Sequence, residues 1–125
     1  MAAFQTPRTI LIVDDDPSLR ESLAELLAEE GYAAACAEDG RSALALLQSQ
    51  QPPCLILLDL LMPVMDGWEF RNRQRQLAGL AEIPVVVTTA LSAEYRRENR
   101  LGAAAYLNKP LDVPQLLQLV AEFCG

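Results

Sequence analysis

The segment LILLDLLMPVMDG, residues 55 to 67, contains an aspartate, Asp59, directly after four apolar residues that are typical of a buried strand. Burying a carboxylate is costly unless its surroundings supply partners for the charge. A helix is expected to follow, from about residue 67 to residue 78. The position of Asp59 at the end of a buried strand therefore predicts that other parts of the chain bring partners to it.

Length and charge limit the classes of protein that this chain can represent. With 125 residues and 51% apolar content, it is expected to form one domain with a single good core. The net charge of −7 would repel nucleic acid phosphates and anionic lipid surfaces. The sequence has no basic leader and no apolar run long enough to cross a membrane. We therefore expect a cytoplasmic protein that binds neither nucleic acid nor membrane.

The sequence has three cysteines, Cys36, Cys54 and Cys124, and none of them has CxxC spacing. All three lie in apolar stretches. The expectation is therefore that they are buried, reduced thiols of the core.

Short strand-like runs alternate with amphipathic segments of helical length. Apolar positions such as Leu19, Leu23 and Leu27 recur at helical spacing, while Asp16 before Pro17 is a good helix start. Strands are expected at residues 9–13, 33–37, 55–58, 83–87 and 105–107, and helices at 17–30, 40–50, 67–78, 92–101 and 113–123. Near-continuous apolar strands that alternate with helices predict a doubly wound α/β domain, a parallel sheet covered on both faces.

Polar residues follow four of the predicted strands. In a doubly wound sheet the ligand site lies beyond the carboxyl ends of the strands, so residues far apart in sequence should converge there. The residues at these ends are Asp14, Asp15 and Asp16, then Asp59, then Thr88 and Thr89, and finally Asn108 and Lys109.

Several carboxylates in one cleft repel each other unless positive charge is present. Mg²⁺ suits such a site because it prefers oxygen ligands, uses one or two carboxylates and is usually completed by a phosphoryl oxygen. A lysine ammonium and a threonine hydroxyl suit the remaining oxygens of a transferring phosphoryl group. The cleft is therefore predicted to perform phosphoryl transfer, which is catalysed mainly by positioning and charge neutralisation.

Four segments, ILIVDDDP, LLDLLMPVMDG, PVVVTTA and AYLNKPLD, resemble in order and spacing the receiver domain of two-component response regulators. The resemblance covers essentially residues 1–125 and implies a flavodoxin-like fold with five helices and five parallel strands in the order 2-1-3-4-5. It also implies that Asp59 accepts a phosphoryl group from a histidine kinase or a phosphotransfer partner. The sequence has no histidine, so this chain cannot be its own phosphohistidine donor.

The same resemblance implies a role for each matching residue near Asp59. Asp15 would be a direct Mg²⁺ ligand and Asp14 a water-mediated one, with the backbone carbonyl of Leu61 completing the metal site. Lys109 would pair with the phosphoryl group, and the bond to the following proline is one that is usually cis in the family.

The resemblance also implies a switch that relays the signal. The hydroxyl of Thr89 would move toward the phosphoryl group, and Tyr106 would then turn inward as the aromatic switch. The signal would leave through the surface formed by the fourth helix, the fifth strand and the fifth helix. On this view the chain is no enzyme for other substrates but a phosphoacceptor that catalyses its own phosphotransfer and slow autodephosphorylation.

The residues two positions beyond Asp59 and Thr89 flank the path of the water that hydrolyses the phosphoryl group in receivers. Here they are Leu61 and Leu91, which cannot orient a water by hydrogen bonds. We therefore expect a long-lived phosphorylated state. If both leucines point away from the site, the lifetime is ordinary.

Two other functions remain open at this point. A phosphatase of the haloacid dehalogenase type would use Asp14 as nucleophile in a DxDxT signature, but Ser18 stands at the threonine position and the chain is short for that class. A receiver-like module that only binds partners would not use its site at all. The chain is either a free-standing regulator or a piece of a longer protein.

The arginines of the third and fourth predicted helices form the main basic clusters of an otherwise acidic chain. A solvated face is the default interpretation of such clusters, and a docking surface for an acidic partner is the alternative.

Overall fold

The structure, a computed structural model, describes residues 8–91 and 101–125. Five strands form one sheet in the order β2-β1-β3-β4-β5, and every neighbouring pair is parallel. The strands are β1 (Thr9–Val13), β2 (Ala33–Ala37), β3 (Leu55–Leu58), β4 (Val85–Thr89) and β5 (Ala105–Asn108). The predicted doubly wound fold and its strand order are confirmed.

The described residues form four helices, α1 (Pro17–Glu29), α2 (Gly40–Ser49), α3 (Gly67–Gln74) and α5 (Val113–Cys124). Each begins after an aspartate whose side chain accepts hydrogen bonds from backbone N–H groups of the first turn, which is the usual way to satisfy the free donors at a helix start. The predicted fourth helix at 92–101 falls, except for Leu101, outside the described residues. No described helix is long and apolar enough to span a bilayer.

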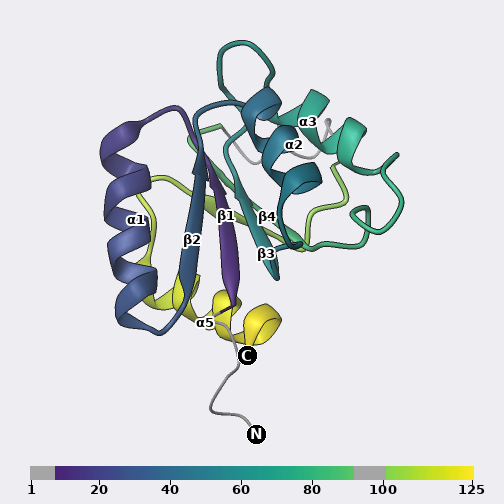
Figure 1. The fold of residues 1–125 in the computed structure, drawn as a ribbon. Coiled ribbons are helices and arrows are strands. Elements are labelled where there is room, and N and C mark those ends of the chain that lie inside the picture. Colours follow the sequence, from purple (N-terminus) through teal and green to yellow (C-terminus); the bar gives the residue numbers. More distant parts are fainter. Residues whose placement is uncertain (1–7, 92–100) are drawn as a thin grey trace, which may run out of the picture.

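The helices cover both faces of the sheet (Figure 1): α1 and α5 pack on one face, and α2 and α3 pack on the other. Alternation along β4 separates the two cores, because Val85 and Val87 belong to the α2–α3 side and Val86 to the α1–α5 side. The three central strands are almost entirely buried, as their continuous apolar sequences require.

Two elements differ from the prediction by more than one residue in their limits. β4 begins at Val85 instead of residue 83, so both threonines lie inside the strand. The proline at position 84 has no N–H to donate to the sheet, and pairing with β3 starts only after it. α3 ends at Gln74 instead of residue 78, and the side-chain Nε2 of Gln74 donates to the carbonyls of Leu80 and Ile83. These bonds hold the following segment back against the helix.

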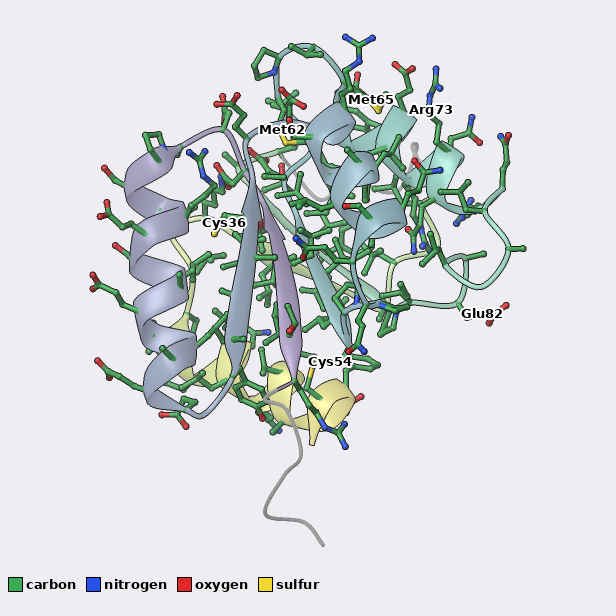
Figure 2. The ribbon with its side chains drawn as sticks, viewed as in Figure 1. Cys36, Cys54, Met62, Met65, Arg73 and Glu82 are labelled. Carbon is green, nitrogen blue, oxygen red and sulfur yellow. A yellow bond between two sulfur atoms is a disulfide. The ribbon has the colours of Figure 1, made fainter. Side chains whose placement is uncertain are left out.

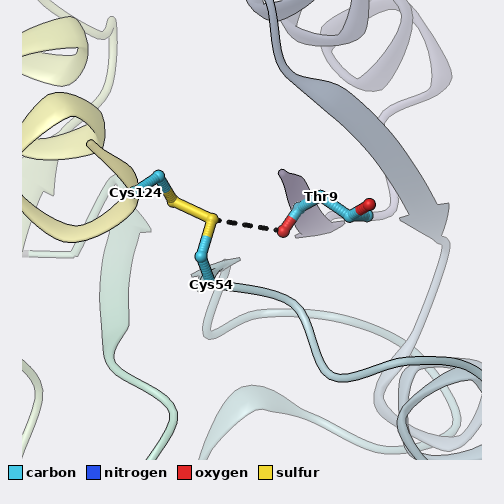
Figure 3. The surroundings of a disulfide bond; sticks show 3 residues. All are labelled: Thr9, Cys54 and Cys124. Atoms are coloured by element: carbon cyan, nitrogen blue, oxygen red, sulfur yellow. Dashed lines mark hydrogen bonds between the residues drawn. A yellow bond between two sulfur atoms is a disulfide. The ribbon is translucent and has the colours of Figure 1, made fainter. Parts of the chain in front are cut away.

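The expectation that all three cysteines are reduced core thiols is wrong. Cys54, just before β3, forms a disulfide with Cys124, the last residue of α5 (Figure 3), and Cys36 is a free, exposed thiol on β2. The sequence could not show this pairing, because the two cysteines are 70 positions apart and meet only when α5 packs against the sheet. The bond connects the end of the chain to the central part of the sheet.

The interpretation of the α3 arginines as a solvated face is wrong for Arg71. Its side chain is only 8% exposed, and its guanidinium donates to the carbonyls of Leu101 and Gly102 at 3.0 Å each and to the Gln74 side chain at 2.7 Å. Arg73, two residues later, is exposed and pairs with Glu69. One arginine of this cluster is therefore a structural clamp, while its neighbour belongs to the solvated face.

Candidate functional site

Asp59 is fixed by the backbone on which it sits. Its N–H donates to the Val13 carbonyl at 2.9 Å, which aligns it with the end of β1. Its Oδ1 atom accepts a hydrogen bond from the N–H of Leu60 at 2.8 Å, and the residue is 6% exposed. The carboxylate is therefore held at the end of a rigid strand with one oxygen already oriented.

Gly67 at the start of α3 is required by the close approach of this helix to Asp59. A Cβ atom at position 67 would lie 2.5 Å from the carbonyl oxygen of Asp59 and 2.8 Å from the Cα of Leu60. The N–H of Gly67 donates to the Leu60 carbonyl at 2.9 Å. No side chain fits in this position, so the glycine allows α3 to begin directly against the strand end.

Three carboxylates meet at this end of the sheet. Oxygen atoms of Asp14, Asp15 and Asp59 lie within 4.8 Å of one another. Asp14 is buried, Asp15 is exposed, and the N–H of Asp16 donates to Asp14 Oδ1 at 2.9 Å. The donor set consists of carboxylate oxygens with one open, solvent-facing side, which fits a hard divalent cation that keeps several waters.

Lys109 supplies positive charge to this cluster. Its Nζ atom lies 2.7 Å from Asp14 Oδ2 and 3.3 Å from Asp59 Oδ2, so one ammonium bridges two buried carboxylates. Burial alone would lower the pKa of Lys109, but the hydrogen bond to Asp14 and the charges of both aspartates outweigh it and raise this pKa. Lys109 is therefore firmly charged.

Burial raises the pKa of Asp59 above its usual value, and the nearby charge of Asp14 adds to this effect. The charge and hydrogen bond of Lys109 and the N–H of Leu60 act in the opposite direction without cancelling it. The ionised form of Asp59 is therefore held at a free-energy cost, which a cation or the loss of its negative charge would relieve.

Thr89 is fully buried at the end of β4, and the N–H of Lys109 donates to its carbonyl at 2.9 Å. Its Oγ1 atom accepts a hydrogen bond from the N–H of Leu91 at 3.1 Å. Side chains alternate along β4, so Thr89 shares a face with Val87 and Thr88 points to the opposite face. Thr89 therefore lies beside Lys109 with a hydroxyl bonded to its own loop.

Tyr106 is a half-buried residue of β5 that pairs with Val87 in the sheet and packs on the α2–α3 core. The Lys109–Pro110 bond that follows this strand is cis, as the resemblance implied.

The loop between Asp59 and α3 is mostly apolar and partly exposed. Leu61 is 53% exposed, and Val64 is 73% exposed with a φ of 68°, which is an unusual conformation for a β-branched residue. Met62 and Met65 are half-buried and pack on the α2–α3 core, so the loop is anchored on both sides of Val64. Leu91, on the other side of the site, is half-buried on the same core.

Two contributors to the site region were not expected. The Arg20 guanidinium of α1 donates to the backbone carbonyl of Asp14 at 2.7 Å and so supports the loop after β1. Arg71 holds the backbone just before β5, and burial lowers the pKa of its guanidinium, with the charge of Arg75 adding to this effect. Both arginines bind backbone carbonyls, and no sequence pattern identifies such acceptors.

Residues 10–121 match the family model described as "Response regulator receiver domain". The chain therefore belongs to the receiver domain family of response regulators. Membership of this family implies signalling that depends on phosphorylation and interaction with histidine kinases or phosphotransfer partners.

Relatives and solved structures agree with this assignment. The chain is 38% identical over 117 residues, 92% of its length, to the "Uncharacterized 14.6 kDa protein in sodA1 3′region" of Leptolyngbya boryana, of which it covers 88%. It is 41% identical over 111 residues, 86% of its length, to the response regulator MprA of Mycobacterium tuberculosis, and it spans only 46% of that protein.

Among solved structures, the receiver domain of the sensor histidine kinase PA1611 of Pseudomonas aeruginosa superposes with a TM-score of 0.85 and 27% identity, covering 94% of this chain and 98% of that one. That structure has a magnesium ion coordinated in its active site cleft.

Proposed function

We propose that this chain is a signalling switch that accepts a phosphoryl group on Asp59 from a phosphohistidine of a sensor kinase or a phosphotransfer protein. The observation that supports this most strongly is the bridging position of Lys109 between Asp14 and Asp59. This arrangement places the proposed nucleophile Asp59, the proposed metal ligand Asp14 and the Lys109 ammonium together at the carboxyl end of a parallel sheet. Ligands bind at this end in this class of fold.

In the proposed transfer, a carboxylate oxygen of Asp59 attacks phosphorus in line with the bond to the donor nitrogen. The oxygen–phosphorus bond forms as the nitrogen–phosphorus bond breaks, and the donor imidazole leaves with the electron pair. Lys109 holds one phosphoryl oxygen by its ammonium, and the hydroxyl of Thr89 holds another after leaving the N–H of Leu91. Strand β3 keeps the nucleophile in place, so little motion is needed at the reacting atom.

Asp14 and Asp15 would hold Mg²⁺ together with Asp59 and the backbone carbonyl of Leu61. The three carboxylates already share one small cluster, and the related PA1611 domain binds magnesium in its cleft. When bound, the ion neutralises phosphoryl and carboxylate charge during the transfer. Asp14 is buried and already shares Lys109, which suits the water-mediated role, whereas the exposed Asp15 suits direct coordination.

The signal would leave through the surface formed by the fourth helix expected at residues 92–101, β5 and α5, of which the structure describes β5, α5 and Leu101. Movement of the Thr89 hydroxyl toward phosphate would free space near β5 into which Tyr106 turns. The partners are then a sensor kinase or phosphotransfer protein and a downstream protein target, in the cytoplasm, with no role for nucleic acid. Affinity capture with the beryllofluoride-bound wild type, compared with Asp59→Asn, would identify the target.

The decisive experiment is phosphorylation by acetyl phosphate with Mg²⁺, followed by mass spectrometry. We expect one added phosphoryl group, mapped to Asp59, which EDTA prevents. Asp59→Asn should abolish the label, and Asp15→Ala should strongly weaken Mg²⁺ binding in calorimetry. The matched control is Asp16→Asn, because Asp16 caps α1 and should accept this change without loss of labelling.

The same experiment decides between the alternatives. Label that persists in Asp59→Asn and maps to Asp14 would indicate chemistry of the haloacid dehalogenase type instead. A wild-type protein that binds neither Mg²⁺ nor beryllofluoride would indicate a module that only binds partners.

A further inference from the structure

We propose that the Cys54–Cys124 disulfide is a redox-responsive tether that controls how firmly α5 is attached to the sheet. The bond joins the residue before β3 to the last residue of α5. Asp59 follows the opposite end of the same strand. Figure 2 shows Cys54 at the end of the sheet nearest α5. It shows Met62 and Met65, of the loop between Asp59 and α3, at the other end.

The two cysteines differ in exposure, since Cys124 is fully buried and Cys54 is half-buried. An external thiol is therefore expected to attack the Cys54 sulfur. A thiolate of a dithiol reductant, of the thioredoxin class, attacks Cys54 Sγ and expels Cys124 as a thiolate that then takes up a proton. The second thiol of the reductant resolves the mixed disulfide and releases Cys54 as a thiol. The reductant becomes a disulfide, so two electrons and two protons are transferred in all.

A hydrogen-bond acceptor for the reduced Cys54 thiol is already in place. Cys54 Sγ lies 3.4 Å from the carbonyl oxygen of Thr9, the contact drawn as a dashed line in Figure 3. A disulfide sulfur has no hydrogen to donate, so this contact becomes a hydrogen bond only when Cys54 is a thiol. The N–H of Cys54 also donates to Thr9 at 2.9 Å and keeps the residue in place in both states.

Reduction should loosen α5 without unfolding it. Cys124 is the last of three buried positions of this helix, after Leu116 and Val120, and a reduced cysteine still packs as a small apolar side chain. The helix would keep its apolar face but lose the covalent anchor at its end, where helices fray most easily. The Cα atoms of the two cysteines are 5.4 Å apart, within the range for a disulfide, so the bond can form again in the folded chain.

Two features suit the Cys54–Cys124 disulfide to a regulatory role. Disulfides in a reducing cytoplasm are usually transient or redox-sensing, and the proposed function places the chain there. This part of the inference rests on that proposed function, in which α5 belongs to the output surface. Since the tether and Asp59 lie at opposite ends of β3, redox state would change the output surface without changing phosphorylation.

The first test counts thiols and does not depend on phosphorylation. Protein purified without reductant is alkylated in denaturant, and we expect one alkyl group, on Cys36, against three after reduction. Peptide mapping should recover Cys54 linked to Cys124. Three alkyl groups in the air-oxidised protein, or a link through Cys36, would overturn the proposal. Cys36→Ser is the matched control and should retain the bond.

The second test asks whether the folded chain responds to reductant. Reduced thioredoxin, or dithiothreitol alone, should open the bond while the circular dichroism of the folded protein persists. Amide hydrogen exchange over residues 113–124 should then accelerate by about tenfold, with β1 and β3 unchanged. Cys54→Ser should exchange like the reduced wild type and ignore dithiothreitol. A bond that opens only in denaturant, or an α5 whose exchange is the same in both states, contradicts a regulatory tether.

The third test separates this proposal from the proposed function. Acetyl phosphate should label oxidised and reduced protein at rates within about twofold, because the reacting groups are supported from the other end of β3. A larger change in rate would contradict independent control of the output surface. Absence of label in both forms would refute phosphorylation and leave the thiol count and the exchange result standing.

Discussion

The Nζ atom of Lys109 lies 2.7 Å from Asp14 Oδ2, although the two residues are 95 positions apart in the sequence. The ammonium therefore supplies positive charge to the same carboxylates that would bind a metal ion. A cation already at the cluster reduces the attraction for a second one, so Lys109 and Mg²⁺ are expected to compete in the unphosphorylated protein.

Lys109→Met tests this competition. Removing the ammonium leaves two buried carboxylates without their positive partner, so Mg²⁺ affinity should rise by about fivefold or more in calorimetric titrations. The control is Arg8→Met, the same change of charge at the amino end of β1, which should alter affinity by less than about twofold because of screening. Equal affinities for wild type and Lys109→Met would mean that the ammonium does not share the metal position.

Asp59→Asn should stabilise the protein at neutral pH. Because burial raises the folded-state pKa of Asp59 above its unfolded value, folding favours the neutral carboxyl, and stability is lost as the pH rises through the folded pKa. The asparagine remains neutral. Its advantage should shrink as the pH falls through the folded pKa and vanish below the unfolded one.

Urea unfolding without Mg²⁺ across this pH range measures the difference in unfolding free energy. Asp16→Asn should leave stability nearly unchanged, because asparagine caps helices as well as aspartate. An Asp59→Asn protein that is less stable than the wild type at neutral pH would show that the contact with Lys109 outweighs the burial cost.

The leucines two positions beyond Asp59 and Thr89 should prolong the phosphorylated state. Leu61→Asn combined with Leu91→Glu would supply groups that can orient a water, and dephosphorylation should accelerate by roughly tenfold, about 1.4 kcal/mol on the barrier. Loss of label is followed in Mg²⁺ without a phosphatase. Val64→Asn, an exposed apolar position of the same loop, is the matched control and should keep the wild-type rate. A double variant as slow as the wild type would exclude shielding by these side chains.

Thr89→Ala should accept phosphate but lose the response of Tyr106. In the resting structure the Thr89 hydroxyl is bonded to the N–H of Leu91, and its transfer to the phosphoryl group is the proposed trigger. Beryllofluoride should shift the amide NMR signals around Tyr106 in the wild type and in Thr89→Ser, which keeps the hydroxyl, but not in Thr89→Ala. Shifts confined to the Asp59 loop in all three proteins would mean that no such switch exists.

Two neighbouring arginines of α3 should differ sharply in their effect on stability. Arg71→Met leaves the Gly102 carbonyl and the Gln74 side-chain oxygen without this donor, at a cost of about 2–4 kcal/mol in unfolding free energy, whereas the Leu101 carbonyl keeps its hydrogen bond from Arg75. Arg73→Met removes only an exposed pair with Glu69, worth less than about 1 kcal/mol. Equal urea midpoints for the two variants would contradict the assignment of Arg71 as a clamp.

Most of the sheet could be predicted because apolar runs mark its central strands. The ranges of β1, β2 and β3 were predicted as observed, whereas β4 was displaced because the apolar run begins before Pro84. The meeting of Asp14, Asp15, Asp59 and Lys109 was also predictable, since the fold alone brings the carboxyl ends of its strands together. These are features that periodicity and topology determine.

The unpredicted features depend on contacts that leave no periodic signal. Arg71 looks like its exposed neighbour Arg73 in the sequence, and the acceptors that distinguish them, such as the Gly102 carbonyl, are brought to Arg71 by the fold. The pairing of Cys54 with Cys124 requires the final packing of α5. Such features follow from tertiary structure, and residue type or spacing does not indicate them.

The shortness of β3 has a consequence for how many messages the molecule can carry. Four residues, Leu55–Leu58, separate Cys54 from Asp59, a span of about 17 Å at the usual rise of a strand. If Asp59 is phosphorylated at one end and the Cys54–Cys124 disulfide forms at the other, one chain has four distinguishable states. It can carry neither modification, the phosphoryl group alone, the disulfide alone, or both. A partner that reads the α5 surface would then respond to a combination of inputs, in the manner of a logic gate, within a single small domain.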